Sequence, residues 1–141
     1  MKNMTNSKVR KLGRRELRSL FRALKFKDGL TVGSEETAEP NDFIYWYNKN
    51  RDGAVGNYII YEVVASDPTH RADDAVIGRE FYAQIDVFST SSFESKLLTE
   101  TLENIENALV AAGFEVDARS EDYEHDTRLY HQAFFVSKIY L

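Results

Sequence analysis

Hydrophobic positions recur along this chain at helical spacing in two places. Between residues 7 and 26, Leu17, Leu20, Phe21 and Leu24 follow the i, i+3, i+4, i+7 pattern of one helical face. Arg and Lys fill many of the remaining positions, so the segment predicts a basic amphipathic helix. Gly13 disfavours helix by about 1 kcal/mol relative to alanine, and we expect the stable part of the helix to begin near it.

A second helix is predicted over 92–112, where apolar residues again return every three to four positions. Ser91 followed three residues later by Glu94 has the form of a capping box at its start. Gly113 stands where a helix C-terminus favours a left-handed residue. Both ends of this helix are therefore marked in the sequence.

Alternating apolar and polar positions predict strands elsewhere. The clearest is 79–89, where Phe81, Ala83, Ile85 and Val87 share one side. The other expected strands are 43–48, 57–65, 114–122 and 128–140. We expect the first two to form a hairpin across the loop that holds Gly53 and Gly56, and segments 27–42 and 66–78 to be polar connections.

This order of elements predicts an α+β fold, a mostly antiparallel sheet of four or five strands with two main helices on one face. The chain length of 141 residues suits a single domain spanning 1–141. Within it we distinguish a basic N-terminal helix at 1–26, a loop-rich segment at 27–56 and an α/β core at 57–141.

The apolar pattern then predicts a surface that the two helices leave uncovered. Strand 128–140 is apolar on both sides, and strand 79–89 adds aromatic residues opposite its main apolar face. Leaving three or four aromatics in water would forgo on the order of 10 kcal/mol. A contact with another subunit or a partner is favoured, and coverage by loops 27–42 and 66–78 is the alternative. The predicted interface consists of Tyr82, Asp86, Phe88, Tyr130, Phe134 and Tyr140.

Charge is distributed unevenly. Residues 1–30 hold ten Lys/Arg against two acids, whereas residues 31–141 hold eight against 21, for an overall net charge of −5. Such asymmetry indicates an end that meets nucleic acid, an anionic surface or an acidic neighbour, although a solvated basic helix explains it equally. The predicted basic contact surface comprises Arg14, Arg15, Arg18, Arg22 and Lys25.

Signals for chemistry are weak. There is no cysteine, and no catalytic or cofactor-binding motif such as H-E-x-x-H or a phosphate loop occurs. His125 and His131 lie among acids in "EDYEHDTRLYHQAFF", but we interpret this stretch as the mouth of a hairpin with a turn at Asp126-Thr127, not as a metal site. Asp86 is expected to form an ion pair or a hydrogen bond, either within the chain or across a subunit boundary, since Asp is rare in strands. We therefore expect that the protein is not an enzyme and that it binds no cofactor or metal.

Targeting signals are also missing from the pattern. The start "MKNMTNSKVRK" lacks the apolar core of a secretory signal, and no apolar run approaches the roughly 20 residues that cross a membrane. We therefore expect a soluble intracellular protein that does not contact membranes.

Two runs together resemble a known family. These are "FYAQIDVFSTSSFESKLLTETLENIENALVAAGFEV" and "DYEHDTRLYHQAFFV". Residues 58–141 resemble the tail completion, or tail terminator, proteins of long-tailed bacteriophages and related head–tail joining proteins. The resemblance rests on the strand Gln84 to Ser89, on Gly113, and on Asp126, Thr127, Tyr130 and His131, which match a "D-T-x-x-Y-H" turn into the last strand.

The resemblance implies a structural virion protein at the head–tail interface of a phage made in the host cytoplasm. It implies a homo-oligomeric ring, commonly a hexamer, which ends growth of the tail tube and docks to the connector. The implied partners are other copies of the chain, the tail tube protein and the head–tail connector protein, with DNA only as passing cargo. A nucleic-acid-binding module that uses the basic N-terminal helix is the alternative.

Overall fold

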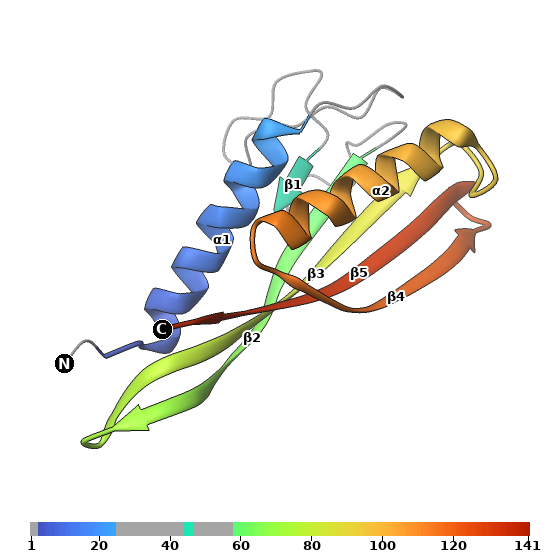
Figure 1. Ribbon diagram of the computed structural model, residues 1–141. Coiled ribbons are helices and arrows are strands. Elements are labelled where there is room, and N and C mark those ends of the chain that lie inside the picture. The colour runs from blue at the N-terminus through green and yellow to red at the C-terminus, as the bar shows by residue number, and fades with distance from the viewer. Residues whose placement is uncertain (1–2, 25–43, 47–57) are drawn as a thin grey trace.

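The computed structural model describes residues 3–24, 44–46 and 58–141. A five-stranded sheet carries two helices on one of its faces (Figure 1). The elements follow one another along the chain as α1 (Asn6–Ala23), β1 (Ile44–Trp46), β2 (Tyr58–Ala72), β3 (Ala75–Ser89), α2 (Lys96–Ala111), β4 (Glu115–Glu124) and β5 (Leu129–Tyr140). The strand order is β1-β2-β3-β5-β4, and every pairing except β1 with β2 is antiparallel. The predicted α+β class and sheet are confirmed.

The first half of the sheet differs from the sequence prediction. Segment 66–78 is not a polar connection, because β2 and β3 continue through it as a long hairpin that turns at Asp73 and Asp74. Both aspartates have positive φ angles, 49° and 62°, as the two central residues of a type I′ hairpin turn require. The expected hairpin between the first two strands is also wrong, because β1 pairs with β2 in parallel. Segment 27–42 and the loop with Gly53 and Gly56 lie outside the described residues.

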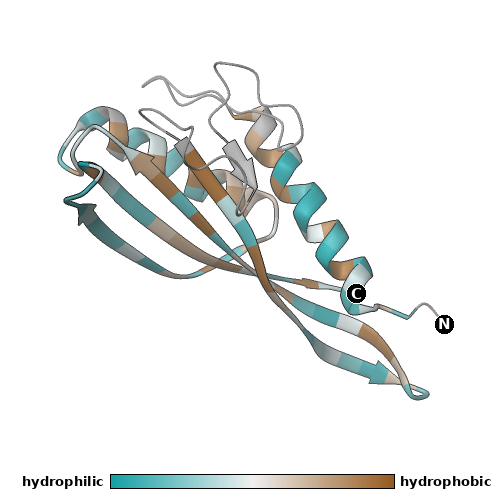
Figure 2. Cartoon of the chain, turned by 180° about the vertical axis from the view of Figure 1, so that it is seen from behind, coloured by the Kyte–Doolittle hydropathy of each residue, from teal (hydrophilic) through white to brown (hydrophobic). Residues whose placement is uncertain are grey.

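The helix face of the sheet holds the core. Phe81, Ala83, Ile85 and Val87 of β3 are buried there, as their alternation predicted. Helix α1 covers them with Val9, Leu17 and Phe21, and α2 adds Ile105 and Leu109. Seen from behind, the opposite face of the sheet has no helix over it among the described residues (Figure 2). We call this opposite side the outer face.

Gly13 lies in the middle of α1, which begins at Asn6 with Thr5 as its N-cap. The expectation that the stable helix starts near Gly13 is therefore wrong. A Cβ atom at this position would lie 2.4 Å from Cε2 of the buried Phe81 ring. The glycine thus lets the helix approach β3 more closely than any side chain would permit.

Helix α2 begins at Lys96, with Ser95 at the N-cap position, so the capping box at Ser91 and Glu94 is not formed. Instead, the Ser92 hydroxyl accepts a hydrogen bond from the Glu94 amide at 3.1 Å in the turn before the helix. At the other end, Gly113 has a φ of 90°, in agreement with its predicted role at the C-terminus.

Lys138 connects both helices to the sheet. Its Nζ donates to the Glu16 carboxylate of α1 at 2.6 Å and to the Ala112 carbonyl after α2 at 2.7 Å. The same ammonium lies 5.3 Å from the ring centroids of Phe114 and Tyr140. One cation thus stabilises the carbonyl end of α2 and the position of α1 together.

Candidate interaction surfaces

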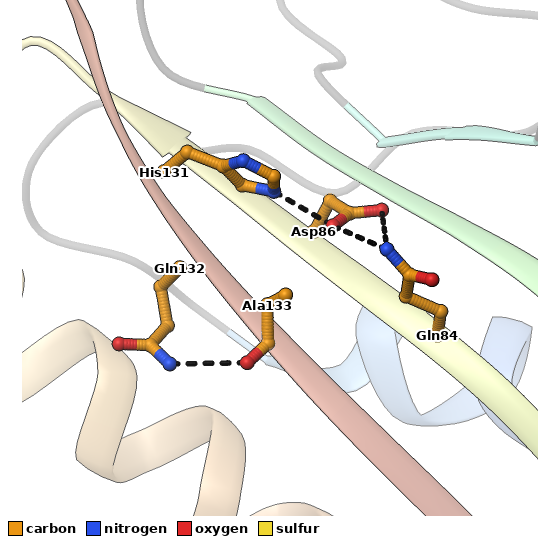
Figure 3. A network of polar contacts seen from close by, with 5 residues as sticks. All are labelled: Gln84, Asp86, His131, Gln132 and Ala133. Atoms are coloured by element: carbon orange, nitrogen blue, oxygen red, sulfur yellow. Dashed lines mark hydrogen bonds and ion pairs between the residues drawn. The ribbon is translucent and has the colours of Figure 1, made fainter. Parts of the chain in front are cut away.

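Asp86 and His131 meet on the outer face, although 45 residues separate them in sequence. Strands β3 and β5 pair so that Phe88 stands opposite His131, and the neighbouring Asp86 is then within reach of the imidazole. His131 Nε2 lies 2.7 Å from Asp86 Oδ1, and Gln84 Nε2 donates to both carboxylate oxygens at 3.0 and 3.2 Å (Figure 3). The His131 ring also stacks on Phe88, with centroids 4.4 Å apart.

This network compensates for the loss of water around the Asp86 carboxylate, which lies in a strand. Only 14% of the Asp86 side chain is exposed, so its bonds to His131 and Gln84 replace water. The structure confirms that Asp86 is an ion-pair or hydrogen-bond partner, and the partner belongs to the same chain. Burial and the Asp86 charge together raise the pKa of the neighbouring Glu62 above its usual value. The outer face is therefore acidic at this point.

The two histidines do not converge. His125 lies in the exposed turn between β4 and β5, edge-on to the Tyr123 ring at 5.1 Å, while His131 lies along β5. In this turn Thr127 donates to the Glu124 carboxylate at 2.9 Å, and Arg128 takes a positive φ of 59°. Within residues 3–24, 44–46 and 58–141, no group of three or more His, Asp and Glu side chains could hold a metal ion.

The predicted interface is not one surface. Strand β3 pairs with β5 so that Ile85 stands opposite Phe134, which places even-numbered β5 residues on the helix face. Consequently Tyr82, Asp86 and Phe88 lie on the outer face, whereas Tyr130, Phe134 and Tyr140 lie on the helix face. Phe88, Phe134 and Tyr140 are buried within the single chain, so the estimate of 10 kcal/mol forgone does not apply to them.

The other two aromatic residues of the predicted interface, Tyr130 and Tyr82, are half-buried. Tyr130 packs edge-on against Phe93 at 5.3 Å and lies 4.8 Å from the Tyr123 ring. Tyr82 stands among carboxylates on the outer face. Hydrogen bonding to Glu80 raises the pKa of Tyr82 to about 12, and Asp67 and Asp117 contribute through their charge.

The side of β5 that is exposed is the opposite of the predicted one. The large apolar side chains exposed on this strand are Phe135, at 37%, and Ile139, at 47%, followed by the terminal Leu141 at 76%. Phe135 and Ile139 share the outer face with Tyr82 and lie beside β4. Because β5 is apolar on both sides, its period of two carried no signal for which side would be buried.

Cations form a stripe along α1. A shallow hollow of about 560 Å³ runs along the helix, and the described residues that line it are Asn6, Ser7, Arg10, Lys11, Arg14, Arg15 and Arg18. Of the predicted basic surface, Arg14, Arg15 and Arg18 belong to this stripe. The Arg22 side chain and Lys25 lie outside what the structure describes. Arg10 and Lys11 join the stripe, as their spacing of four and three residues from Arg14 could have indicated.

Comparison with known proteins does not extend this picture. No protein-family model matches the chain, and no curated protein shows a significant match to it. In the described part of the chain, no helix has both the length and the apolar character needed to span a bilayer.

Proposed function

We propose that the chain is a structural virion protein of a long-tailed phage, which forms a ring at the head–tail junction, ends the tail tube and docks to the connector. The proposal starts from the resemblance of residues 58–141 to tail completion and head–tail joining proteins. The observation that carries it is the outer face, which no described helix covers and which exposes Phe135 and Ile139. Exposed apolar residues gathered on one face are typical of a protein that assembles with others.

The two motifs on which the resemblance rests lie in contact. The strand from Gln84 to Ser89 is the part of β3 that holds Asp86, and Tyr130 and His131 come from the second motif. The bond between Asp86 and His131 therefore joins them across the β3–β5 pairing. This contact supports treating the motifs as one structural unit with a framework role.

Electron microscopy and mass photometry of the purified chain test the proposal, first alone and then with the products of neighbouring genes. We expect rings of fixed subunit number, seated at the end of a tube when a tube protein is present. A chain that remains monomeric and binds none of these products would exclude the proposed function.

The basic stripe on α1 favours one second candidate, a nucleic-acid-binding module. That function requires binding of DNA or RNA whose affinity falls steeply with salt, with a slope of roughly −0.9 for each phosphate neutralised. The net charge of −5 opposes it. Absence of a gel shift at low salt would remove this candidate.

A further inference from the structure

Two oppositely charged surfaces lie apart in the same chain. Helix α1 carries seven Lys/Arg and one Glu, a net charge of +6, and strand β4 carries five Asp/Glu and one Arg, a net charge of −4. On α1 the stripe includes the exposed Lys11 and Arg15 and the half-buried Arg10. On β4 the exposed Glu115 and Asp122 stand opposite Ser137 and His131 on the outer face. The exposed Asp117 lies at the bulge between Val116 and Ala118, and its charge acts on Tyr82 of the same face. We call these three residues the acidic β4 face.

The two surfaces cannot meet within one molecule. Helix α1 packs on β2 and β3 from the helix face, whereas β4 is the last strand at the far edge of the sheet. Strands β3 and β5 separate β4 from β2, which corresponds to about 14 Å at 4.8 Å per strand. The acidic β4 face also lies on the outer face of the sheet, opposite the side that α1 covers.

Strand β4 has two features of an interface strand, an open edge and exposed apolar side chains beside it. It pairs with β5 on one side, and its other edge has no partner strand among the described residues. An open edge presents unpaired backbone groups, and natural proteins cover such edges or guard them with charge. Phe135, opposite Ala118, and Ile139 expose apolar surface beside the acidic residues. Arginine stems and guanidinium planes pack well on such surface while their charges meet carboxylates.

The electrostatic field on the outer face is negative, as an acidic docking surface requires. The pKa of Tyr82 is raised to about 12, mainly by its hydrogen bond to Glu80, and the charge of Asp117 on β4 also contributes. Because residues 31–141 carry 21 acids against eight bases, an approaching nucleic acid would meet repulsion over most of the molecule. A second copy of the chain instead presents a positively charged surface, the stripe of α1.

We propose that copies associate head to tail, with the basic stripe of α1 in one copy docked on the acidic β4 face and the adjacent Phe135 of the next. Such a contact joins two different patches, so it is heterologous and generates a closed ring or a filament. This inference rests on the proposed function, for which it names the contact between subunits. It also assigns a role to the charge asymmetry of the chain.

Charge reversal in trans provides the test. One variant reverses the stripe (Arg10→Glu, Lys11→Glu and Arg15→Glu), and the other reverses the β4 face (Glu115→Lys, Asp117→Lys and Asp122→Lys). Sedimentation velocity at low salt should show assembly of the wild-type chain and at least about tenfold weaker self-association of each variant alone. An equimolar mixture should restore assembly, because every contact then joins an acidic helix to a basic strand or the reverse.

Matched controls use exposed charges outside both surfaces. Lys8→Glu at the start of α1 and Glu103→Lys on α2 should leave assembly within about twofold of wild type. Far-ultraviolet circular dichroism verifies that each triple variant is folded. If one is not, its neutral counterpart replaces it, with at least about threefold weakening expected. The neutral set is Arg10→Gln, Lys11→Gln and Arg15→Gln for the stripe, and Glu115→Gln, Asp117→Asn and Asp122→Asn for the β4 face.

The outcomes separate the two proposals. Wild-type assembly that neither reversal weakens, or a mixture that fails to recover, overturns the charge contact and leaves the ring proposal standing. A wild-type chain that is monomeric at low salt overturns the contact between copies, and failure to bind neighbouring gene products then excludes the proposed function as well. A monomer that shifts DNA only with an intact stripe would make α1 a nucleic-acid site and also overturn the contact.

Discussion

Replacing Gly13 by alanine should destabilise the protein, although helix propensity alone predicts the opposite. An alanine in the middle of α1 favours the helix by about 1 kcal/mol relative to glycine. The new Cβ, however, would lie 2.4, 2.5 and 2.6 Å from three ring carbons of Phe81. Carbon atoms pack at about 3.5–4.0 Å, so the helix or the ring must move by roughly 1 Å.

Neither helix α1 nor the Phe81 ring is free to move, because Leu17 and Phe21 of the helix are themselves buried in the core. Phe81 is fully buried, and its ring makes edge contacts with Phe114 at 6.3 Å and Tyr140 at 6.2 Å. Overfilling a packed core costs about 1–3 kcal/mol, and so close an approach places the cost near the upper limit. After subtraction of the propensity gain, Gly13→Ala should lower the free energy of unfolding by about 2 kcal/mol.

Urea denaturation followed by circular dichroism measures this difference. Ser19→Ala, on the exposed side of the same helix, is the matched control and should stabilise slightly. In a Phe81→Leu background the aromatic ring is absent, and Gly13→Ala should become neutral or stabilising. If Gly13→Ala stabilises the wild-type chain as much as propensity predicts, the close packing of α1 on β3 is wrong.

Three further substitutions test the polar contacts by the same denaturation assay. Lys138→Met removes both hydrogen bonds between the sheet and the helices and should cost about 1–2 kcal/mol, whereas an unchanged midpoint would show that these bonds add nothing. His131→Ala should cost about 1–3 kcal/mol, because among the described residues it leaves the Asp86 carboxylate only the hydrogen bonds from Gln84. His125→Ala in the exposed turn is the control and should cost almost nothing. Equal losses in the two variants would contradict a stabilising bond between His131 and Asp86. Glu62→Gln should stabilise at pH 7, because a raised pKa means that the charged form is disfavoured in the folded state. The gain should shrink below about pH 4.5, where Glu62 is protonated in both states, and a gain independent of pH would count against the raised pKa.

The predicted contact surface shows where local pattern stops being informative. Strand β5 places Phe134 and Phe135 on opposite sides, and both are equally suited to a core. The difference arises because hydrogen bonding to β3 sets Phe134 opposite Ile85, whose side is covered by the helices. The candidate network of Asp86 and His131 likewise depends on pairing between segments 45 residues apart.

What the sequence determined by itself was local: the period of β3, the helical face of α2, the left-handed residue at Gly113, and the separation of positive from negative charge along the chain. Only the tertiary structure decided that β2 and β3 continue through a polar stretch, that Gly13 is a contact point, and which side of β5 is buried. The physical reason is that propensity and periodicity act over a few residues, whereas strand register and helix approach are set by hydrogen bonds and packing between distant segments.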